Sequence, residues 1–247
     1  MCNSDIRSAI VMGVVPKISE SSFVPQKLVR GELVEGVCKD CDARARTRCL
    51  AAMLARSEAF IQSGAPVLLA SADQHQLALY KQHFTNLTHI SREGDYDDPN
   101  CILGVDLNDL SRFKADSFLY AFLIGVIDYI PTPWKAFSEL MRVLKPGGTA
   151  IIYIMPYRVT SLSEGVKVIN TNALAHEAYA RKQGKETGIP DCQFDKDALM
   201  GWLKEAGFNP SIVLVKDHLS PLELKYFVAK KPFRPQAPHL ASQSASS

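Results

Sequence analysis

The sequence predicts an α/β protein with a doubly wound, mostly parallel sheet of seven strands that ends in an antiparallel hairpin. Three observations lead to this prediction. Short and almost uninterrupted apolar runs alternate with segments of helical periodicity, which is typical of parallel strands buried on both faces. Two strand-like runs follow the last helix, which is typical of an antiparallel sheet edge. The chain has 247 residues, enough to bury a large core in one domain.

The first predicted helix spans residues 43–63, where apolar side chains recur at helical spacing and Gly64 can end the helix. Residues 1–42 before it mix polar turns with short apolar clusters, such as residues 10–15. These clusters are too small to form a core of their own, so we expect this N-terminal extension to close over the site as a lid. After Pro66, the apolar run 67–70 predicts the first strand of the sheet, and a helical segment follows to about residue 83.

The second half of the chain continues the alternation. Thr132 and Pro133 form a typical helix start, because proline has the φ of the first helical turn and needs no N–H there. Trp134, Phe137 and Trp202 lie on apolar helical stripes, so we expect them in the core. The other predicted elements are strands at 87–90, 101–105, 118–127 and 149–155, a polar helix at 172–182, a helix from Asp195 to Gly207, and hairpin strands at 212–215 and 226–229.

The predicted globular domain is residues 43–230. Residues 231–247 contain three prolines, four serines and no acidic residue, which predicts a disordered tail. Lys and Arg total 28 against 26 Asp and Glu, so the net charge of +2 supplies no broad field for nucleic acid or an anionic membrane. The longest apolar run, residues 118–127, has about half the length of a membrane-spanning helix. We therefore expect a cytoplasmic protein that acts on a small molecule; the sequence does not predict its oligomeric state.

Two groups of motifs carry a resemblance to a known family. Residues 139–148 read Glu-Leu-Met-Arg-Val-Leu-Lys-Pro-Gly-Gly and precede a strand, while Asp-Ser-Phe at 116–118 and Val-Ile-Asp-Tyr-Ile-Pro at 126–131 lie upstream. This region resembles the part after strand 4 of class I S-adenosylmethionine (SAM)-dependent methyltransferases. Cys-Lys-Asp-Cys at 38–41, Arg46 and Arg48, and Val-Leu-Leu-Ala-Ser-Ala-Asp at 67–73 resemble a bacterial, methyltransferase type 11-like subgroup with a glycine-poor first motif.

The resemblance covers residues 38–230 and implies SAM as the cofactor, with binding residues after the first three strands. Ser71 is small enough for close approach, and Asp73 offers a carboxylate to the ammonium group of the cofactor. Glu93 matches the acid that holds the ribose hydroxyls, although three aspartates crowd the same turn. Asp106 matches the acid that accepts from the adenine amino group, with a turn or cap carboxylate as the alternative. Leu107 would supply a backbone N–H and an apolar wall.

The resemblance also places two residues at the reaction space. Asp128 is the candidate general base, with helix capping before Pro131 as the alternative, and Tyr129 would contact substrate or cofactor. His176 is a candidate for substrate contact. Of Arg46 and Arg48, which are two residues apart and share no helical face, one could meet the cofactor carboxylate while the other is solvated.

The chain has six cysteines, and Cys38 and Cys41 are spaced like half of a zinc site. A tetrahedral site needs four ligands, and the sequence offers no complete set, so we expect no bound metal and interpret this pair as structural or vestigial. The leading function is transfer of the sulfonium methyl group to a small molecule. The alternatives are a reaction at another carbon of the sulfonium, by aminocarboxypropyl transfer or closure to a four-membered ring with release of methylthioadenosine, and a non-catalytic interaction protein.

Overall fold

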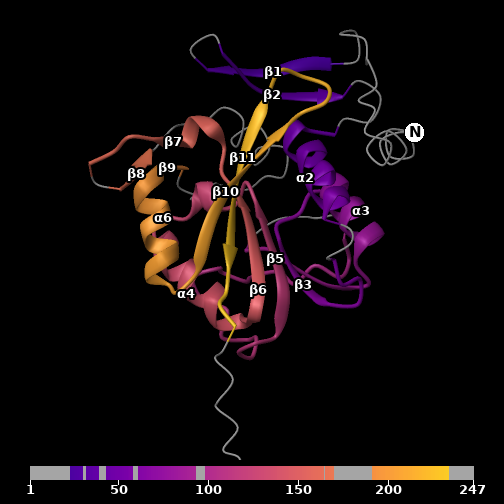
Figure 1. Ribbon diagram of the computed structural model, residues 1–247, viewed down its shortest axis with the longest axis vertical. Helices are drawn as coiled ribbons and strands as arrows, with labels where there is room; N and C mark the ends of the chain where they lie inside the picture. Colours follow the sequence, from indigo (N-terminus) through magenta and orange to yellow (C-terminus); the bar gives the residue numbers. More distant parts are fainter. Residues whose placement is uncertain are drawn as a thin grey trace, which may run out of the picture.

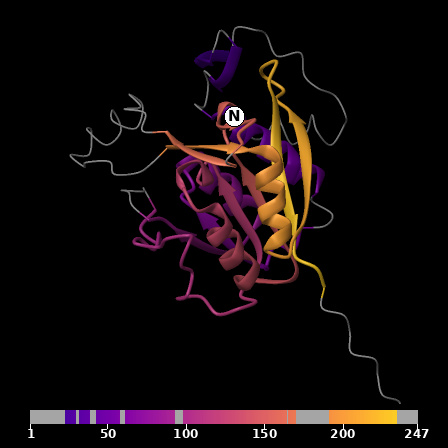
Figure 2. The same ribbon diagram turned by 90° about the vertical axis from the view of Figure 1, so that its left-hand side faces the viewer.

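The computed structural model describes residues 23–29, 32–38, 43–57, 61–92, 98–163, 165–169 and 191–233 of the chain. Its centre is a six-stranded sheet with helices on both faces (Figures 1 and 2). The doubly wound α/β architecture predicted from the sequence is confirmed. From one edge to the other, the strands are β10 (Asn209–Lys216), β11 (Glu223–Lys230), β6 (Leu144–Tyr153), β5 (Phe118–Ile124), β3 (Pro66–Ala70) and β4 (Asn86–Ile90).

Four of these strands pair in parallel, and the two that come last in the chain, β10 and β11, form the predicted hairpin. Strands β6, β5, β3 and β4 run in one direction, whereas β11 is antiparallel to both β6 and β10. The chain passes from β3 to the edge strand β4 and then returns to place β5 on the other side of β3. Doubly wound sheets bind ligands at such a reversal, outside the carboxyl ends of the strands. The structure therefore directs attention to the ends of β3 and β5.

The predicted strand at residues 101–105 is reduced to a single bridge. Ile102 pairs in parallel with Ile90 beyond the edge strand β4. The N–H of Ile102 donates to the His89 carbonyl at 2.9 Å, and the N–H of Ser91 donates to the Ile102 carbonyl at 3.0 Å. Gly104 then adopts a φ of +75°. The chain turns at this glycine, so the described central sheet has six strands where we predicted seven.

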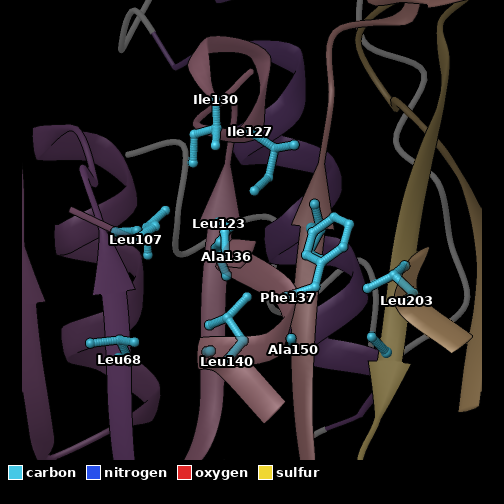
Figure 3. Close-up of a cluster of buried hydrophobic side chains, with 14 of the residues drawn as sticks. Leu68, Leu107, Leu123, Ile127, Ile130, Ala136, Phe137, Leu140, Ala150 and Leu203 are labelled. Carbon is cyan, nitrogen blue, oxygen red and sulfur yellow. The ribbon is translucent and has the colours of Figure 1, made fainter. Parts of the chain in front are cut away.

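The side chains of the buried strands alternate between two cores. In β3, Val67 and Leu69 face α2 (Ala45–Arg56) and α3 (Gln74–His83), whereas Leu68 and Ala70 face α4 (Pro133–Val143) and α6 (Lys196–Glu205). Because successive residues of a strand point to opposite faces, a strand covered by helices on both sides is apolar at every position. Figure 3 shows how the second core joins strand residues to one stripe of α4: Leu68, Leu123, Ala150, Ala136, Phe137 and Leu140.

Most predicted helix boundaries agree with the structure. Asp195 caps α6, since its Oδ1 accepts from the N–H groups of Asp197 and Ala198, both at 2.9 Å. Gly207, with a φ of +101°, follows the end of this helix, and Pro133 is the first residue of α4. Helix α2 ends at Arg56, so it is shorter than the predicted helix over residues 43–63.

The prediction that Trp134 lies in the core is wrong, because its side chain is 37% exposed. Its ring centroid lies 5.3 Å from that of the half-buried Trp202 on α6. Phe137, one turn later on α4, is buried as predicted. Helical spacing predicted the stripe correctly, but Trp134 stands in the first turn, at the seam between α4 and α6 rather than beneath the helix.

Two smaller sheets and two 3₁₀ helices lie toward the carboxyl ends of the parallel strands (Figure 1). In the predicted N-terminal extension, β1 (Phe23–Val29) and β2 (Glu32–Cys38) form an antiparallel hairpin. The second small sheet contains β7 (Val159–Thr160), β8 (Val166–Ile169) and β9 (Asp191–Asp195), with β9 in the middle. The 3₁₀ helices η3 (Ile127–Tyr129) and η4 (Pro156–Arg158) follow β5 and β6. The apolar cluster at 10–15 and the predicted helix at 172–182 lie outside the described residues.

The first residue of the predicted tail belongs to the folded domain. Lys231 Nζ donates to Asp116 Oδ1 at 2.8 Å. It also donates to two carbonyls near the end of α4, those of Met141 at 2.7 Å and Leu144 at 2.5 Å. Residues 234–247 lie outside the described residues. Within the described part of the chain, no helix combines the length and apolar character needed to cross a membrane.

Candidate functional site

The turn between β3 and α3 has no glycine, yet it adopts a backbone conformation that glycine favours. Ser71 has a φ of +49°, in the left-handed region, which costs a residue with a Cβ roughly 1–2 kcal/mol. Its N–H donates to the Ile90 carbonyl at 2.8 Å, and its Oγ lies 3.2 Å from the Oγ of Ser91. Contacts with the end of β4 therefore stabilise this turn.

Asp73, the last residue of the turn, has two partners. Its Oδ1 accepts the N–H of Gln76 at 2.9 Å and caps α3, while its Oδ2 lies 3.9 Å from Nη2 of Arg46 on α2. The Asp73 side chain is 34% exposed and that of Arg46 is 11% exposed. A partly accessible carboxylate and a guanidinium thus lie side by side after β3. Such a pair offers charges opposite to those of the carboxylate and ammonium groups of an amino acid.

The two arginines of α2 face different partners, as their spacing predicts. Arg48 is 4% exposed, and its Nε and Nη2 donate to the two carboxylate oxygens of Asp217 at 2.9 and 2.6 Å. Its Nη1 donates to the Ala43 carbonyl. We predicted that one of the two arginines would be solvated, but Arg48 is buried. It joins α2 to the segment between β10 and β11.

Asp128 lies in η3, directly after β5, and is 1% exposed. Its Oδ1 accepts the N–H of Met155 at 2.9 Å, just beyond the end of β6. Its Oδ2 is buried and has no hydrogen-bond partner among the described residues. The carboxyl group thus connects the ends of two neighbouring strands. It is not the helix cap that was the alternative, because Thr132 is the N-cap residue of α4.

The environment of Asp128 changes its acidity. Burial raises the pKa of its carboxyl group from 3.8 to about 6, because the charged form loses hydration. The Met155 N–H and the positive charges of Arg158 and Arg46 act in the opposite direction and limit the rise in pKa. A carboxylate with this pKa is a stronger base at neutral pH than an exposed aspartate. Tyr129, the next residue of η3, is half-buried.

The predicted adenosine-binding residues lie in different environments. Asp106 is half-buried, and its Oδ1 accepts the N–H of Asn108 at 2.8 Å, which is the turn contact named as the alternative. Leu107 is 5% exposed and belongs to the core that contains Leu68 and Ile127 (Figure 3). Glu93 lies outside the described residues.

A buried pair beside this turn was missed by sequence reasoning. Nε2 of His89, on β4, accepts the N–H of Ala72 at 3.1 Å, and Nδ1 lies 2.9 Å from Asp98 Oδ2. Burial would raise the pKa of Asp98, but hydrogen bonds from His89 and the Asn100 N–H outweigh it, so the pKa is lowered. The available signal was a histidine next to the last apolar residue of a predicted strand, because a buried imidazole needs hydrogen-bond partners.

Four of these groups meet near the reversal between β3 and β5. Ser71 and Asp73 follow β3, Arg46 lies beside Asp73, and Arg46 is close enough to lower the pKa of Asp128. The Arg46 and Asp73 pair and the unpartnered Asp128 Oδ2 fit a ligand that carries an amino-acid part and a positive charge, as SAM does. Among the described residues, no group of three His, Cys, Asp or Glu side chains could hold a metal ion. Cys41 and His176 lie outside the described ranges.

Comparisons with known proteins concern the family and the fold. Residues 54–152 match the methyltransferase domain family. The 1,6-didemethyltoxoflavin-N1-methyltransferase of Burkholderia thailandensis, solved with 1,6-didemethyltoxoflavin and S-adenosylhomocysteine, is 16% identical; the match covers 76% of this chain and 79% of that one, with a TM-score of 0.53. A Haloferax volcanii protein solved with a methyltransferase activator is 14% identical, with coverage of 77% and 92% and a TM-score of 0.51. None of the curated proteins matches the sequence. At these identities the two structures are similar in fold.

Proposed function

We propose that this chain, whose residues 54–152 match the methyltransferase domain family, is a class I SAM-dependent methyltransferase that transfers the methyl group of SAM to a small-molecule acceptor. The net charge of +2 supports a small acceptor over nucleic acid, because counterion release needs a concentrated basic surface. The Burkholderia thailandensis structure has a similar fold and holds 1,6-didemethyltoxoflavin together with S-adenosylhomocysteine.

The observation that carries this proposal is the buried Asp128 carboxylate at the carboxyl end of β5. It has one unpartnered oxygen among the described residues and a pKa of about 6. Burial disfavours the charged form of this carboxyl group and so raises its pKa, and residues with such shifted pKa values cluster at functional sites. We assign Asp128 as the general base that removes a proton from the acceptor, and Tyr129 as its neighbour at the reaction space.

The amino-acid part of the cofactor would lie over the turn after β3. Arg46 would meet its carboxylate and Asp73 its ammonium group, since these two side chains are 3.9 Å apart and partly accessible. Ser71 would allow close approach at this turn. Asp106 would accept from the adenine amino group beside Leu107, and Glu93 would hold the ribose hydroxyls.

Methyl transfer would require two contributions from this chain, alignment of the acceptor and removal of its proton. Bound SAM supplies a methyl group on a sulfonium, which is a good leaving group. The chain therefore needs to align the acceptor with that methyl group and to exclude water, and alignment alone can account for much of the rate. Asp128 would accept the acceptor's proton through Oδ2, while the Met155 N–H holds Oδ1 in place.

Product analysis tests the proposal against the alternatives. Purified protein incubated with SAM and candidate acceptors should form S-adenosylhomocysteine. Methylthioadenosine as the main product would favour aminocarboxypropyl transfer or ring closure. If calorimetric titration detects binding of neither SAM nor S-adenosylhomocysteine, the non-catalytic interaction protein would be the better description.

Replacing Asp106 with alanine is expected to weaken the binding of S-adenosylhomocysteine by about 1–3 kcal/mol, through loss of a charge-assisted hydrogen bond to the adenine. Asp109 provides a matched control, because it stands in the same segment, is exposed, and likewise accepts a turn N–H, that of Ser111, at 3.0 Å. Asp109→Ala should leave the affinity unchanged, as measured by calorimetry. Equal affinities for the two variants would show that Asp106 serves the turn alone.

We also propose that residues 1–42 act as a lid over the cofactor. The β1–β2 hairpin in this segment lies toward the carboxyl ends of the parallel strands (Figure 1), and a lid there would exclude water from the sulfonium. Hydrogen exchange over residues 23–38 of the full chain should slow when S-adenosylhomocysteine is added. Exchange in the buried part of β6, residues 151–153, should change little. If the exchange rate of the hairpin is the same with and without the ligand, a role of this segment in a subunit interface would be favoured instead.

A further inference from the structure

The turn after β3 is bound to β4 by main-chain and side-chain contacts. Ser71 uses its N–H and its Oγ, which meet the Ile90 carbonyl and the Ser91 Oγ. The third contact is different, because the N–H of Ala72 donates to a side chain, the Nε2 of His89, at 3.1 Å. His89 is 3% exposed and lies on β4 opposite Leu69 of β3. A buried imidazole therefore provides the acceptor for the central N–H of the turn.

The second contact of His89 determines which ring nitrogen carries the proton. Nε2 can accept from Ala72 only when it is unprotonated, so the proton of the neutral ring is on Nδ1. Nδ1 then donates to Oδ2 of Asp98 at 2.9 Å, and the other oxygen of Asp98 accepts the N–H of Asn100 at 3.3 Å. A carboxylate that accepts a hydrogen bond from Nδ1–H keeps the proton on Nδ1 and so leaves Nε2 available as an acceptor. Asp98 thus orients His89, and His89 orients the turn.

We propose that His89, oriented by Asp98, is a positioning residue for cofactor binding that holds Ser71, Ala72 and Asp73 in the conformation that receives the amino-acid part of the cofactor. This inference rests on the proposed function. Ala72 lies between the strained Ser71, with its φ of +49°, and Asp73, which pairs with Arg46. In the absence of glycine, a turn of this conformation relaxes unless its neighbours hold it. If it relaxed, Asp73 and Arg46 would no longer be side by side.

Two conservative substitutions separate the two contacts of the ring. Gln can place an amide oxygen near the position of Nε2, so His89→Gln keeps an acceptor for the Ala72 N–H. Asn can place an amide N–H near the position of Nδ1, so His89→Asn keeps the contact with Asp98 but leaves the Ala72 N–H without its acceptor. Both variants are uncharged and polar, and each retains one of the two contacts. They form a matched pair that differs in which contact is kept, the one with the turn or the one with Asp98.

The experiment measures the Kd of S-adenosylhomocysteine by calorimetry for the full-length wild type and both variants, together with each Tm. We expect His89→Asn to raise the Kd about tenfold, which corresponds to roughly 1.4 kcal/mol. His89→Gln should restore most of the affinity, and the two variants should have similar Tm values. Without any ligand, amide exchange at Ala72 should be faster in His89→Asn than in His89→Gln.

The possible outcomes distinguish this inference from the proposed function. If the wild type binds S-adenosylhomocysteine and the two variants have the same Kd as each other, the positioning role alone is overturned. Losses of affinity that follow the losses of Tm in both variants would also overturn it, since they would indicate general destabilisation. Failure of the wild type to bind would overturn the proposed function and this inference with it. A loss confined to His89→Asn, with faster exchange at Ala72, is the supporting result.

Discussion

Replacing Asp128 with asparagine is expected to lower kcat about 10²–10⁴-fold, the usual contribution of a general base. The amide has nearly the same shape and can still accept the Met155 N–H through Oδ1, but it cannot take up a proton from the acceptor. In the wild type, kcat/KM should rise with pH as Asp128 ionises near its pKa of about 6 and then level off. The variant should lack this rise.

The stability of the same variant provides an independent check. The pKa of Asp128 is raised from 3.8 to about 6 in the folded state, so between these values the folded protein binds the proton more tightly than the unfolded chain does. This contribution to stability is complete below about pH 4 and is lost as the pH rises to about 6. The shift corresponds to roughly 3 kcal/mol. Asp128→Asn carries no such proton, so the stability of wild type relative to the variant should fall over this range.

Kinetic assays and denaturant unfolding at pH 4 and pH 8 measure the two effects. Asp109→Asn is the matched control, because Asp109 is exposed, and this substitution should affect neither quantity. A loss of kcat below fivefold would mean that alignment alone drives the reaction. In that case Asp128 would connect β5 to β6 without serving as a base.

Replacing Arg48 with methionine is expected to destabilise the fold by about 3–5 kcal/mol, because it leaves the carboxylate of Asp217 buried without its main counter-charge. Asp217 is 5% exposed and would retain the hydroxyl of Ser220 at 2.5 Å, which cannot replace a guanidinium. The free energy of unfolding from denaturant titration measures this loss. Arg56→Met is the control, since Arg56 lies in the last turn of the same helix and is exposed.

A second substitution shows whether the effect belongs to the pair. Arg48→Met combined with Asp217→Leu removes both charges, and apolar side chains of similar size can replace a buried ion pair at little cost. The double variant should therefore recover part of the stability that the single variant loses. If the double variant is less stable than Arg48→Met alone, Asp217 contributes chiefly through its contacts with residues 218–220.

Periodicity and turn residues were sufficient to predict the layered sheet. Strand β3 is apolar at every position because helices cover both of its faces. Asp195 and Gly207 mark helix ends because a cap and a left-handed turn each require particular residue types. These signals act over a few residues, so they are visible in the sequence. Trp134 shows the limit of this reasoning, because its exposure depends on where α6 crosses α4.

The candidate site divides in the same way. Asp73, Asp106 and Asp128 were predicted because each follows a strand in a motif that resembles a known family. The partners of these residues were not predicted: Arg46 for Asp73, Met155 for Asp128, and His89 for the turn after β3. Each partner comes from a different element than the residue it contacts, and no local pattern records such a pair.

The sequence alone was thus enough for the order of the strands of the central sheet and the helices that cover it, for the apolar face of α4 beneath Trp134, and for the positions of carboxylates after strands, because spacing along one chain segment controls these features. The raised pKa of Asp128, the burial of Arg48 with Asp217 and the left-handed turn at Ser71 were settled only when distant segments came together. Their physical basis is desolvation and hydrogen bonding between residues as far apart in the chain as 48 and 217, and both depend on three-dimensional distance rather than on spacing in the sequence.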